Sequence, residues 1–422
     1  MVYKTRFLER IIKKAAASSA AVVVTGPRQA GKTSLLSTIG RKLFPDMEIV
    51  SFDSPAEVDE FNRDPGLFFV NHPDVLLLDE IQNVPSIFPY LKREIDKKPD
   101  KFRFFISGSQ VFPLMRHVAE SLAGRAVILD LWPFCIQEAK DIPRNSDAGD
   151  TLALIEQPRL AARLKQNEFI CSDRHDIVPA MLAGGYPKML IHHAGGQWLE
   201  SYRRTYIQRD IRDLAQVADL GKFDRFTVML AGLSGTIINK ARIAQAVGID
   251  NKTVDHWISI LETSYQMIHL PAYARNPTKR LVKRPKYCFA DSGLCLHLQG
   301  IRDSRALLNA PHFGQLFETF VIMEIRKLYG HAGRSWDAFY WRTPAGVECD
   351  LVLSAGGNVI PIEIKHGATI RRDDWKGLNI FMAEHPQETS QGWLISLYPK
   401  IEQLDKKIWH LPVGVLLHGV SG

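Results

Sequence analysis

The sequence is poor in cysteine and contains no long hydrophobic run. Its five cysteines are an odd number without a Cys-x-x-Cys pair, which argues against a disulfide framework and a structural zinc site. No stretch of about 18 apolar residues occurs, so we expect no membrane span and no membrane partner. Residues 15–24 are apolar and follow two lysines, as in a secretory signal, but a phosphate loop follows them directly. We therefore interpret them as a helix end and a buried strand, and expect a cytoplasmic protein with reduced thiols.

The chain also lacks a strong charge of either sign. Its 422 residues include 53 Lys and Arg against 46 Asp and Glu, a net charge of +7, which permits a nucleic-acid partner without requiring one. The hydrophobic share of 45% and the charged share of 23% exclude a disordered tail, a collagen-like fibre and a disulfide-stapled mini-protein. At about 150 residues per domain, the length indicates roughly three domains.

The first third of the chain alternates short apolar runs with helical patterns. Continuous rather than alternating hydrophobicity is typical of strands that are buried on both faces. Such strands separated by helices predict an α/β fold with a parallel sheet. The apolar runs are residues 21–25, 48–52, 75–78, 102–107 and 126–131.

A complete phosphate-binding loop follows the first apolar run. Residues 26–33 read Gly-Pro-Arg-Gln-Ala-Gly-Lys-Thr and satisfy the pattern G-x-x-x-x-G-K-[ST]. The glycines let backbone N–H groups face the phosphates, Lys32 adds a positive charge there, and the Thr33 hydroxyl can ligate Mg²⁺. The predicted cofactors are therefore ATP and Mg²⁺. The predicted nucleotide-binding residues are Gly26, Pro27, Arg28, Gln29, Ala30, Gly31, Lys32, Thr33 and Ser34.

Two acidic residues, Asp79 and Glu80, follow the apolar run 75–78. Ligands bind at the carboxyl edge of open α/β sheets, so Asp79 is expected to hold the Mg²⁺ shell and Glu80 to polarise the attacking water. Ser109 is a candidate γ-phosphate or water contact, with a plain turn residue as the alternative. Arg125 is a candidate arginine finger for a neighbour's nucleotide, which implies a homo-oligomer, and a structural arginine is the alternative.

An acidic hairpin is predicted near the C-terminus. Two apolar strands, residues 347–353 and 358–365, flank a Gly356-Gly357 turn. This register places Asp350 opposite Glu363, on the face that also carries Glu348 and Lys365. Opposed carboxylates repel, and a divalent cation such as Mg²⁺ would compensate them. Pro361 is the weak point of the register because it lacks an N–H group.

The hairpin matches the D…(D/E)-x-K pattern of restriction-endonuclease-like nucleases. Lys365 would stabilise a hydroxide or a phosphorane-like charge. Glu318, on a predicted amphipathic helix over residues 312–330 with Phe317 and Val321 on its apolar stripe, is a candidate additional ligand. A solvated edge face is the alternative interpretation of the hairpin.

A helix-turn-helix rhythm occupies residues 223–262, with helices expected at 223–233, 241–247 and 252–262. A basic stretch without acids follows it and could neutralise DNA phosphates. A winged-helix module used for protein contact is the alternative. The stretch carries Arg275, Lys279, Arg280, Lys283, Arg284 and Lys286, of which the first five are the predicted DNA contacts.

These motifs together resemble the AAA-type ATP-binding proteins of bacteria and archaea, whose C-terminal domain is of unassigned function and contains an endonuclease-like core. The resemblance implies ATP binding and a winged-helix middle region. Competent residue types fill the endonuclease-like positions Glu318, Asp350, Glu363 and Lys365. The resemblance rests on residues 25–33, 77–84, 107–109, 121–125, 131–134, 184–187, 206–211, 314–318, 341–343 and 362–365.

The expected architecture is a P-loop ATPase domain over residues 1–140 and a linker and helical region over 141–220. A winged-helix-like region follows over 221–290, and an endonuclease-like α/β domain over 291–422. The expected function is a Mg²⁺-dependent ATPase that acts on or with DNA and carries a metal-dependent nuclease site. The alternatives are a nucleotide-switched DNA- or protein-binding regulator with an inactive endonuclease-like domain, and an interaction protein without DNA.

Overall fold

The computed structural model describes residues 3–108, 118, 120–140, 148–157, 160, 174–205, 219–276, 280, 283–355 and 357–419. Ser109, Lys279 and Gly356 lie outside these residues, so the predictions for them have no structural counterpart. The chain divides into two compact units. The first comprises Met1–Pro133, Thr263–Tyr265 and Gly330–Arg334, and the second comprises Phe134–Glu262, Gln266–Tyr329 and Ser335–Gly422.

The first unit is built on a five-stranded sheet in the order β2-β3-β4-β1-β5, and every neighbouring pair is parallel. This confirms the predicted α/β fold with a parallel sheet. Strand β4 is inserted between β1 and β3, so the strand before the phosphate loop and the strand that ends in Asp79 are next-nearest neighbours. The strands are β1 (Ala21–Thr25), β2 (Glu48–Ser51), β3 (Leu76–Asp79), β4 (Phe104–Ser107) and β5 (Ala126–Asp130).

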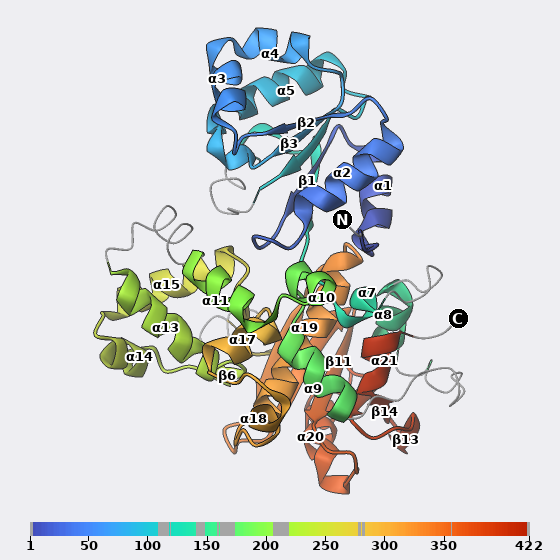
Figure 1. Cartoon of the computed structure of the whole chain (residues 1–422). Coiled ribbons are helices and arrows are strands. Elements are labelled where there is room, and N and C mark those ends of the chain that lie inside the picture. Colours follow the sequence, from blue (N-terminus) through green and yellow to red (C-terminus); the bar gives the residue numbers. More distant parts are fainter. Residues whose placement is uncertain are drawn as a thin grey trace. The chain divides into compact units, whose positions relative to one another are not determined.

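Helices cover both faces of this sheet (Figure 1). Along β1, Val22 and Val24 pack with α1 and α2, whereas Ala21 and Val23 pack with α3, α4 and α5. Alternate side chains of one strand thus enter two different cores, which explains its unbroken hydrophobic sequence. The helices are α1 (Leu8–Ser18), α2 (Lys32–Leu43), α3 (Pro55–Arg63), α4 (Pro65–Asn71) and α5 (Phe88–Lys97).

The second unit begins with a helical part and a small three-stranded antiparallel sheet in the order β6-β8-β7. The three helices expected between residues 223 and 262 are present as α13, α14 and α15, and Gly248 in the left-handed region ends α14. The elements are α7 (Ile136–Ala139), α8 (Ala148–Glu156), α9 (Arg174–Ala183), α10 (Pro187–His192), α11 (Gly195–Thr205), α13 (Leu220–Gly232), β6 (Thr236–Ile237), α14 (Lys240–Val247), α15 (Asn251–Thr263), β7 (Met267–Leu270) and β8 (Lys286–Phe289).

A six-stranded mixed sheet in the order β13-β14-β12-β11-β10-β9 completes the second unit. Helix α19 confirms the expected helix, but its expected single apolar stripe is wrong, because nearly every position from Leu316 to His331 is buried. The elements are α17 (Ser292–Leu298), α18 (Ser304–Leu308), α19 (Phe313–His331), β9 (Ala338–Arg342), β10 (Glu348–Ala355), β11 (Asn358–Lys365), α20 (Lys376–Glu384), β12 (Gly392–Ser396), β13 (Glu402–Asp405), β14 (Ile408–Pro412) and α21 (Val413–His418).

Strands β10 and β11 pair in the register expected from the Gly-Gly turn, from Ala355 opposite Asn358 to Leu351 opposite Ile362. Pro361 pairs with Val352 without a register shift in this ladder, although β11 is a central strand. The neighbouring strand β12 begins at Gly392, where a Cβ would lie 2.9 Å from the Pro361 carbonyl oxygen. A residue without a side chain therefore makes room for the proline.

The side chains of β10 do not alternate regularly between the two faces of the sheet at the start of the strand. The pairing of β10 with β9 shifts between Cys349 and Val352, so these two residues enter the same hydrophobic cluster. Such a shift is typical of a β-bulge and re-aims the side chains beside it. Asp350 lies within this irregular stretch, and its Oδ2 accepts the backbone N–H of Ile364 at 2.8 Å.

No helix among the described residues is long and apolar enough to cross a membrane. Within the same residues, four cysteines are free and buried, namely Cys135, Cys288, Cys295 and Cys349.

Candidate functional site

The phosphate loop connects β1 to α2 at the carboxyl edge of the parallel sheet. Gly26 has φ +146°, and a Cβ there would lie 2.1 Å from the Leu131 carbonyl oxygen, so this position requires glycine. Gly31 caps α2 with φ +96°. The buried Lys32 ammonium donates to the carbonyl oxygens of Gly26 (3.0 Å) and Pro27 (2.9 Å). The lysine charge thus lies inside the loop, where phosphate oxygens would bind.

Thr33, Asp79 and Ser107 meet at the same edge. The Thr33 hydroxyl lies 3.0 and 2.9 Å from the two carboxylate oxygens of Asp79, and the Ser107 hydroxyl donates to Asp79 Oδ1. Burial raises the pKa of Asp79, and the hydrogen bonds from Ser107 and Thr33 oppose this shift. A hydroxyl beside a carboxylate at the end of the phosphate loop provides the oxygen donors that Mg²⁺ prefers.

Glu80 follows directly and has an unusual backbone. Its φ of +51° is in the left-handed region, which costs a residue other than glycine about 1–2 kcal/mol. Its carboxylate accepts a hydrogen bond from the Gln82 side chain. Strained backbone that persists beside a ligand loop is typical of catalytic positions, because the surrounding structure holds the side chain in one direction.

Two residues that the sequence did not point to support the base of the loop. Arg6 is buried, and its guanidinium donates to the carbonyl oxygens of Ala30 (3.1 Å) and Trp132 (2.6 Å). The Tyr265 hydroxyl lies 2.9 Å from Thr25 Oγ1 and donates to Asp130 at 2.5 Å. Arg6 and Tyr265 are far from the loop in sequence, and no motif marks either of them.

Arg125 is not part of the phosphate loop of its own chain. It precedes β5 and pairs with Asp96 through Nε at 2.7 Å. Its neighbour Ala126 is opposite Ala21, the first residue of β1, whereas the loop follows the last residue of that strand. At about 3.3 Å per strand residue, the length of β1 separates the two. An arginine-finger role for Arg125 would therefore concern a second copy of the chain.

The second unit brings the predicted acidic residues together. Asp350 and Glu363 are buried, so the alternative of a solvated edge face is wrong for these two side chains. Lys365 Nζ lies 2.5 Å from Glu363 Oε1, while the buried Glu363 Oε2 has no hydrogen-bond partner. Burial and the nearby Asp350 raise the pKa of Glu363 well above its ordinary value.

Glu318 of α19 belongs to the same cluster. Burial and then Asp350 raise the pKa of Glu318 to about 8, against the opposing charge of Lys286. Lys286 of β8 is 4% exposed, and its Nζ lies 3.0 Å from Glu318 Oε1. The sequence places Lys286 in a basic stretch whose side chains could neutralise DNA phosphates, and its burial among carboxylates corrects that interpretation. At the rim, Glu348 lies 3.9 Å from the half-exposed Arg342.

The basic stretch is only partly available to a ligand. The half-buried Arg280 donates to the Ala274 carbonyl oxygen, and its guanidinium stacks over two aromatic rings. Arg275 is exposed and pairs with Glu388 at 3.0 Å. Lys283 and Arg284 are exposed. Among the described residues of the predicted DNA contacts, the exposed ones are therefore Arg275, which is engaged by Glu388, and Lys283 and Arg284.

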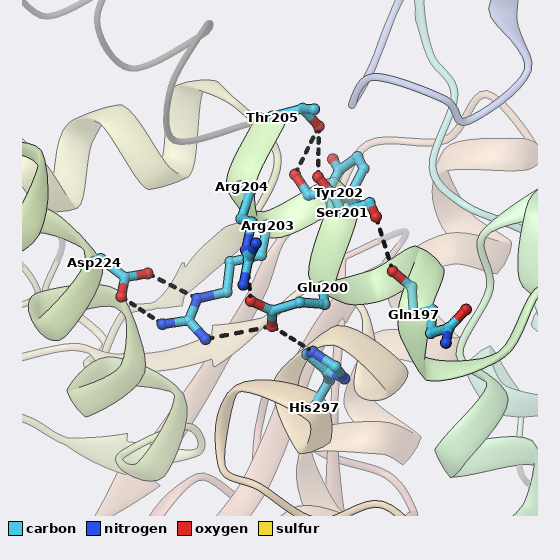
Figure 2. Close-up of polar contacts among 9 residues, drawn as sticks. All are labelled: Gln197, Glu200, Ser201, Tyr202, Arg203, Arg204, Thr205, Asp224 and His297. Carbon is cyan, nitrogen blue, oxygen red and sulfur yellow. Dashed lines mark hydrogen bonds and ion pairs between the residues drawn. The ribbon is translucent and has the colours of Figure 1, made fainter.

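A charged network joins α11, α13 and α17 (Figure 2). Arg203 makes two hydrogen bonds to Asp224, one of them at 2.7 Å, and its third nitrogen lies 3.7 Å from Glu200. Glu200 in turn contacts His297 at 3.1 Å, and this bond lowers the pKa of Glu200. Every group in this chain of contacts is used to hold one helix against another, so we assign the network to the structure of the helical part.

Comparisons with known proteins agree with the class of the first unit. Residues 18–140 match the family model described as an AAA domain. The prediction of an AAA-type domain with a phosphate loop is therefore confirmed for residues 18–140. Residues 174–305 and 313–416 match two further models, each described as a domain of unknown function. The endonuclease-like and winged-helix assignments remain predictions.

Two curated proteins are similar over most of the chain. Uncharacterized protein Mb2031c of Mycobacterium bovis and uncharacterized protein Rv2008c of Mycobacterium tuberculosis are each 27% identical over 370 residues, which cover 87% of this chain and 75% of theirs. Among solved structures, the Walker-type ATPase of Pyrococcus abyssi covers 69% of this chain and 94% of its own, at 13% identity and a TM-score of 0.43. AMPPCP-bound DnaA from Aquifex aeolicus covers 60% of this chain and 85% of its own, at 15% identity and a TM-score of 0.30.

Proposed function

We propose that the protein hydrolyses ATP with Mg²⁺ at the phosphate loop. The observation that carries this proposal is the contact of the Thr33 hydroxyl with both carboxylate oxygens of Asp79. Thr33 would ligate Mg²⁺ directly, Asp79 would hold its water shell, and Lys32 with the loop N–H groups would neutralise phosphate charge. Glu80 would orient and deprotonate the attacking water.

Phosphate release from ATP, measured at increasing Mg²⁺ concentration, tests this proposal. Wild type is expected to turn over only with the metal. Thr33→Val removes the hydroxyl and is expected to lose turnover, while Thr33→Ser keeps the hydroxyl and the activity. Equal turnover by Thr33→Val and Thr33→Ser would contradict the assigned metal ligand.

We further propose that the second unit acts on DNA as a metal-dependent nuclease. The observation in favour is the unpartnered Oε2 of the buried Glu363, beside Asp350 and Lys365. Buried carboxylates at one place are costly without a cation, and Mg²⁺ or Mn²⁺ would supply it. The metal would activate water and polarise a phosphodiester, and Lys365 would stabilise the developing negative charge.

DNA contact would come from the helical part of the same unit. Helices α13, α14 and α15 with the three-stranded sheet support a winged-helix-like module. Lys252 on α15 and Lys283 and Arg284 after β7 are exposed and could neutralise phosphates. Replacing Lys283 and Arg284 by glutamine is expected to weaken binding to all DNA sequences equally and to reduce its salt dependence.

Incubation of plasmid, linear and single-stranded DNA with the protein, ATP and Mg²⁺ or Mn²⁺ tests cleavage. Asp350→Asn is expected to abolish it, whereas Asp373→Asn, at an exposed position outside the cluster, is expected to preserve it. Salt-dependent DNA binding without cleavage in any of these conditions would instead favour a nucleotide-switched regulator. If Asp350→Asn changes no phenotype, and the Lys283 and Arg284 variants bind nucleic acid as wild type does, an interaction protein without DNA would be favoured.

A further inference from the structure

The acidic cluster of the second unit contains a lysine that its sequence pattern does not include. Its inner groups are the carboxylates of Glu318, Asp350 and Glu363 and the ammonium groups of Lys286 and Lys365. Lys365 belongs to the D…(D/E)-x-K pattern and pairs with Glu363. Lys286 comes from β8 of the three-stranded sheet, whereas Asp350 and Glu363 lie on strands of the six-stranded sheet.

Lys286 lies where its positive charge balances the carboxylates of the cluster. It is 4% exposed, its Nζ lies 3.0 Å from Glu318 Oε1, and the ring of Tyr340 lies 5.6 Å from the same atom. Burial alone would lower the pKa of Lys286, but Glu318 and Asp350 raise it. A buried ammonium that stays charged must be compensated by nearby carboxylates, and these are the groups that surround it.

The charges of the cluster fit one divalent cation. When all three carboxyl groups are ionised, as a bound cation requires, three carboxylates against two ammonium groups leave one net negative charge. A divalent cation and one phosphodiester together carry one positive charge, so they would neutralise it. The vacant coordination position is at Glu363 Oε2, which is buried and lacks a hydrogen-bond partner, whereas Glu318 is already engaged by Lys286.

We propose that Lys286 holds Glu318 in this ion pair and so limits the site to a single divalent cation, bound by Asp350 and Glu363. Two-metal sites place a second cation about 3.5–4 Å from the first. Here the Lys286 ammonium supplies the second positive charge, which makes it a positioning residue rather than a metal ligand. This inference rests on the proposed metal-dependent function of the second unit.

Titration of the full chain with Mn²⁺ tests the inference, with bound and free ion counted by electron paramagnetic resonance in the absence of nucleotide. The P-loop variant Lys32→Ala/Asp79→Asn is the background, so that only the second unit binds. Wild-type Lys286 in this background is expected to bind one Mn²⁺. Lys286→Met and Lys286→Gln remove the positive charge beside Glu318 and are expected to bind a second Mn²⁺ or to bind the first about tenfold more tightly.

Lys286→Arg keeps the charge and is expected to bind one Mn²⁺ with unchanged affinity, as is Lys407→Met at an exposed position. Circular dichroism checks that each variant folds, and Lys286→Gln retains a hydrogen bond to Glu318 if Lys286→Met does not fold. One ion with the same affinity in all variants would overturn the role of Lys286 and leave the metal site intact. Absence of Mn²⁺ binding in every variant would overturn both the metal site and the inference.

Discussion

The close approach of Leu131 to Gly26 allows a quantitative prediction for Gly26→Ala. A Cβ at this position would lie 2.1 Å from the Leu131 carbonyl oxygen, where side chains need about 3.0 Å, so the two segments must separate by about 0.9 Å. The left-handed backbone of Gly26 adds strain of about 1–3 kcal/mol, and the forced contact adds about 1–3 kcal/mol. We therefore expect the free energy of unfolding of the first unit to fall by about 2–6 kcal/mol.

The same displacement moves the N–H groups that would bind phosphate. A misplacement of about 1 Å can cost about 100-fold in reaction rate, and we expect ATP affinity to fall by a similar order because the loop N–H groups no longer point at the phosphate oxygens. Titration with a fluorescent ATP analogue and thermal unfolding measure the two effects. Gly124→Ala is the matched control, because Gly124 also has a positive φ (+72°) but no atom within 4 Å of the added Cβ.

Gly124→Ala is expected to lose about 1–2 kcal/mol of stability with no loss of ATP affinity. Wild-type ATP affinity in Gly26→Ala would refute the reasoning, because the loop would then tolerate the Leu131 contact. Equal losses of affinity in both variants would show that general destabilisation, rather than loop geometry, is responsible.

Three further predictions concern single side chains. Arg6→Met removes the guanidinium that binds the Ala30 carbonyl oxygen and is expected to weaken ATP binding by about tenfold, as measured by analogue titration against Arg10→Met, at an exposed position. If Arg125 acts on a neighbour's nucleotide, a mixture of inactive Arg125→Ala and inactive Lys32→Ala is expected to recover ATP hydrolysis, and a mixture that stays inactive would exclude this role. Burial lowers the pKa of His410 to about 4, from about 6.5 in the unfolded chain. The resulting contribution to the free energy of unfolding, about 3 kcal/mol, is therefore complete above pH 6.5 and is lost as the pH falls towards 4. Urea unfolding from pH 7.5 to 4 is expected to show this loss in wild type and a flatter profile in His410→Gln, and identical profiles would contradict the assignment.

The geometry of the phosphate loop could be predicted from the sequence because its residues are local. The loop is one continuous segment, and Asp79 follows an apolar run that identifies its strand. The register of the β10–β11 hairpin was predictable for the same reason, since a two-residue Gly-Gly turn fixes which residues face each other. In both cases residues that are close together in the sequence determine the geometry.

Residues that act through the tertiary structure could not be predicted. Arg6 reaches Trp132 across 126 positions, Tyr265 reaches Thr25 across 240, and Lys286 reaches Glu318 across 32. The sequence does not reveal the burial of Lys286, because the basic residues just before it, Lys283 and Arg284, are exposed, while β8 turns the Lys286 side chain inward. The bulge in β10 was also invisible, because an extra residue in a strand leaves no mark on a short apolar pattern.

The central claim is that Glu80 drives ATP hydrolysis at the loop formed by residues 26–33. The most direct measurement compares ATP affinity and Mg²⁺-dependent phosphate release in wild type and Glu80→Gln. Glutamine keeps the shape and the hydrogen bond but cannot take a proton, so affinity is expected to be unchanged and turnover to fall by at least about 100-fold. Turnover at the wild-type rate in Glu80→Gln, or no Mg²⁺-dependent turnover in wild type, would contradict the account.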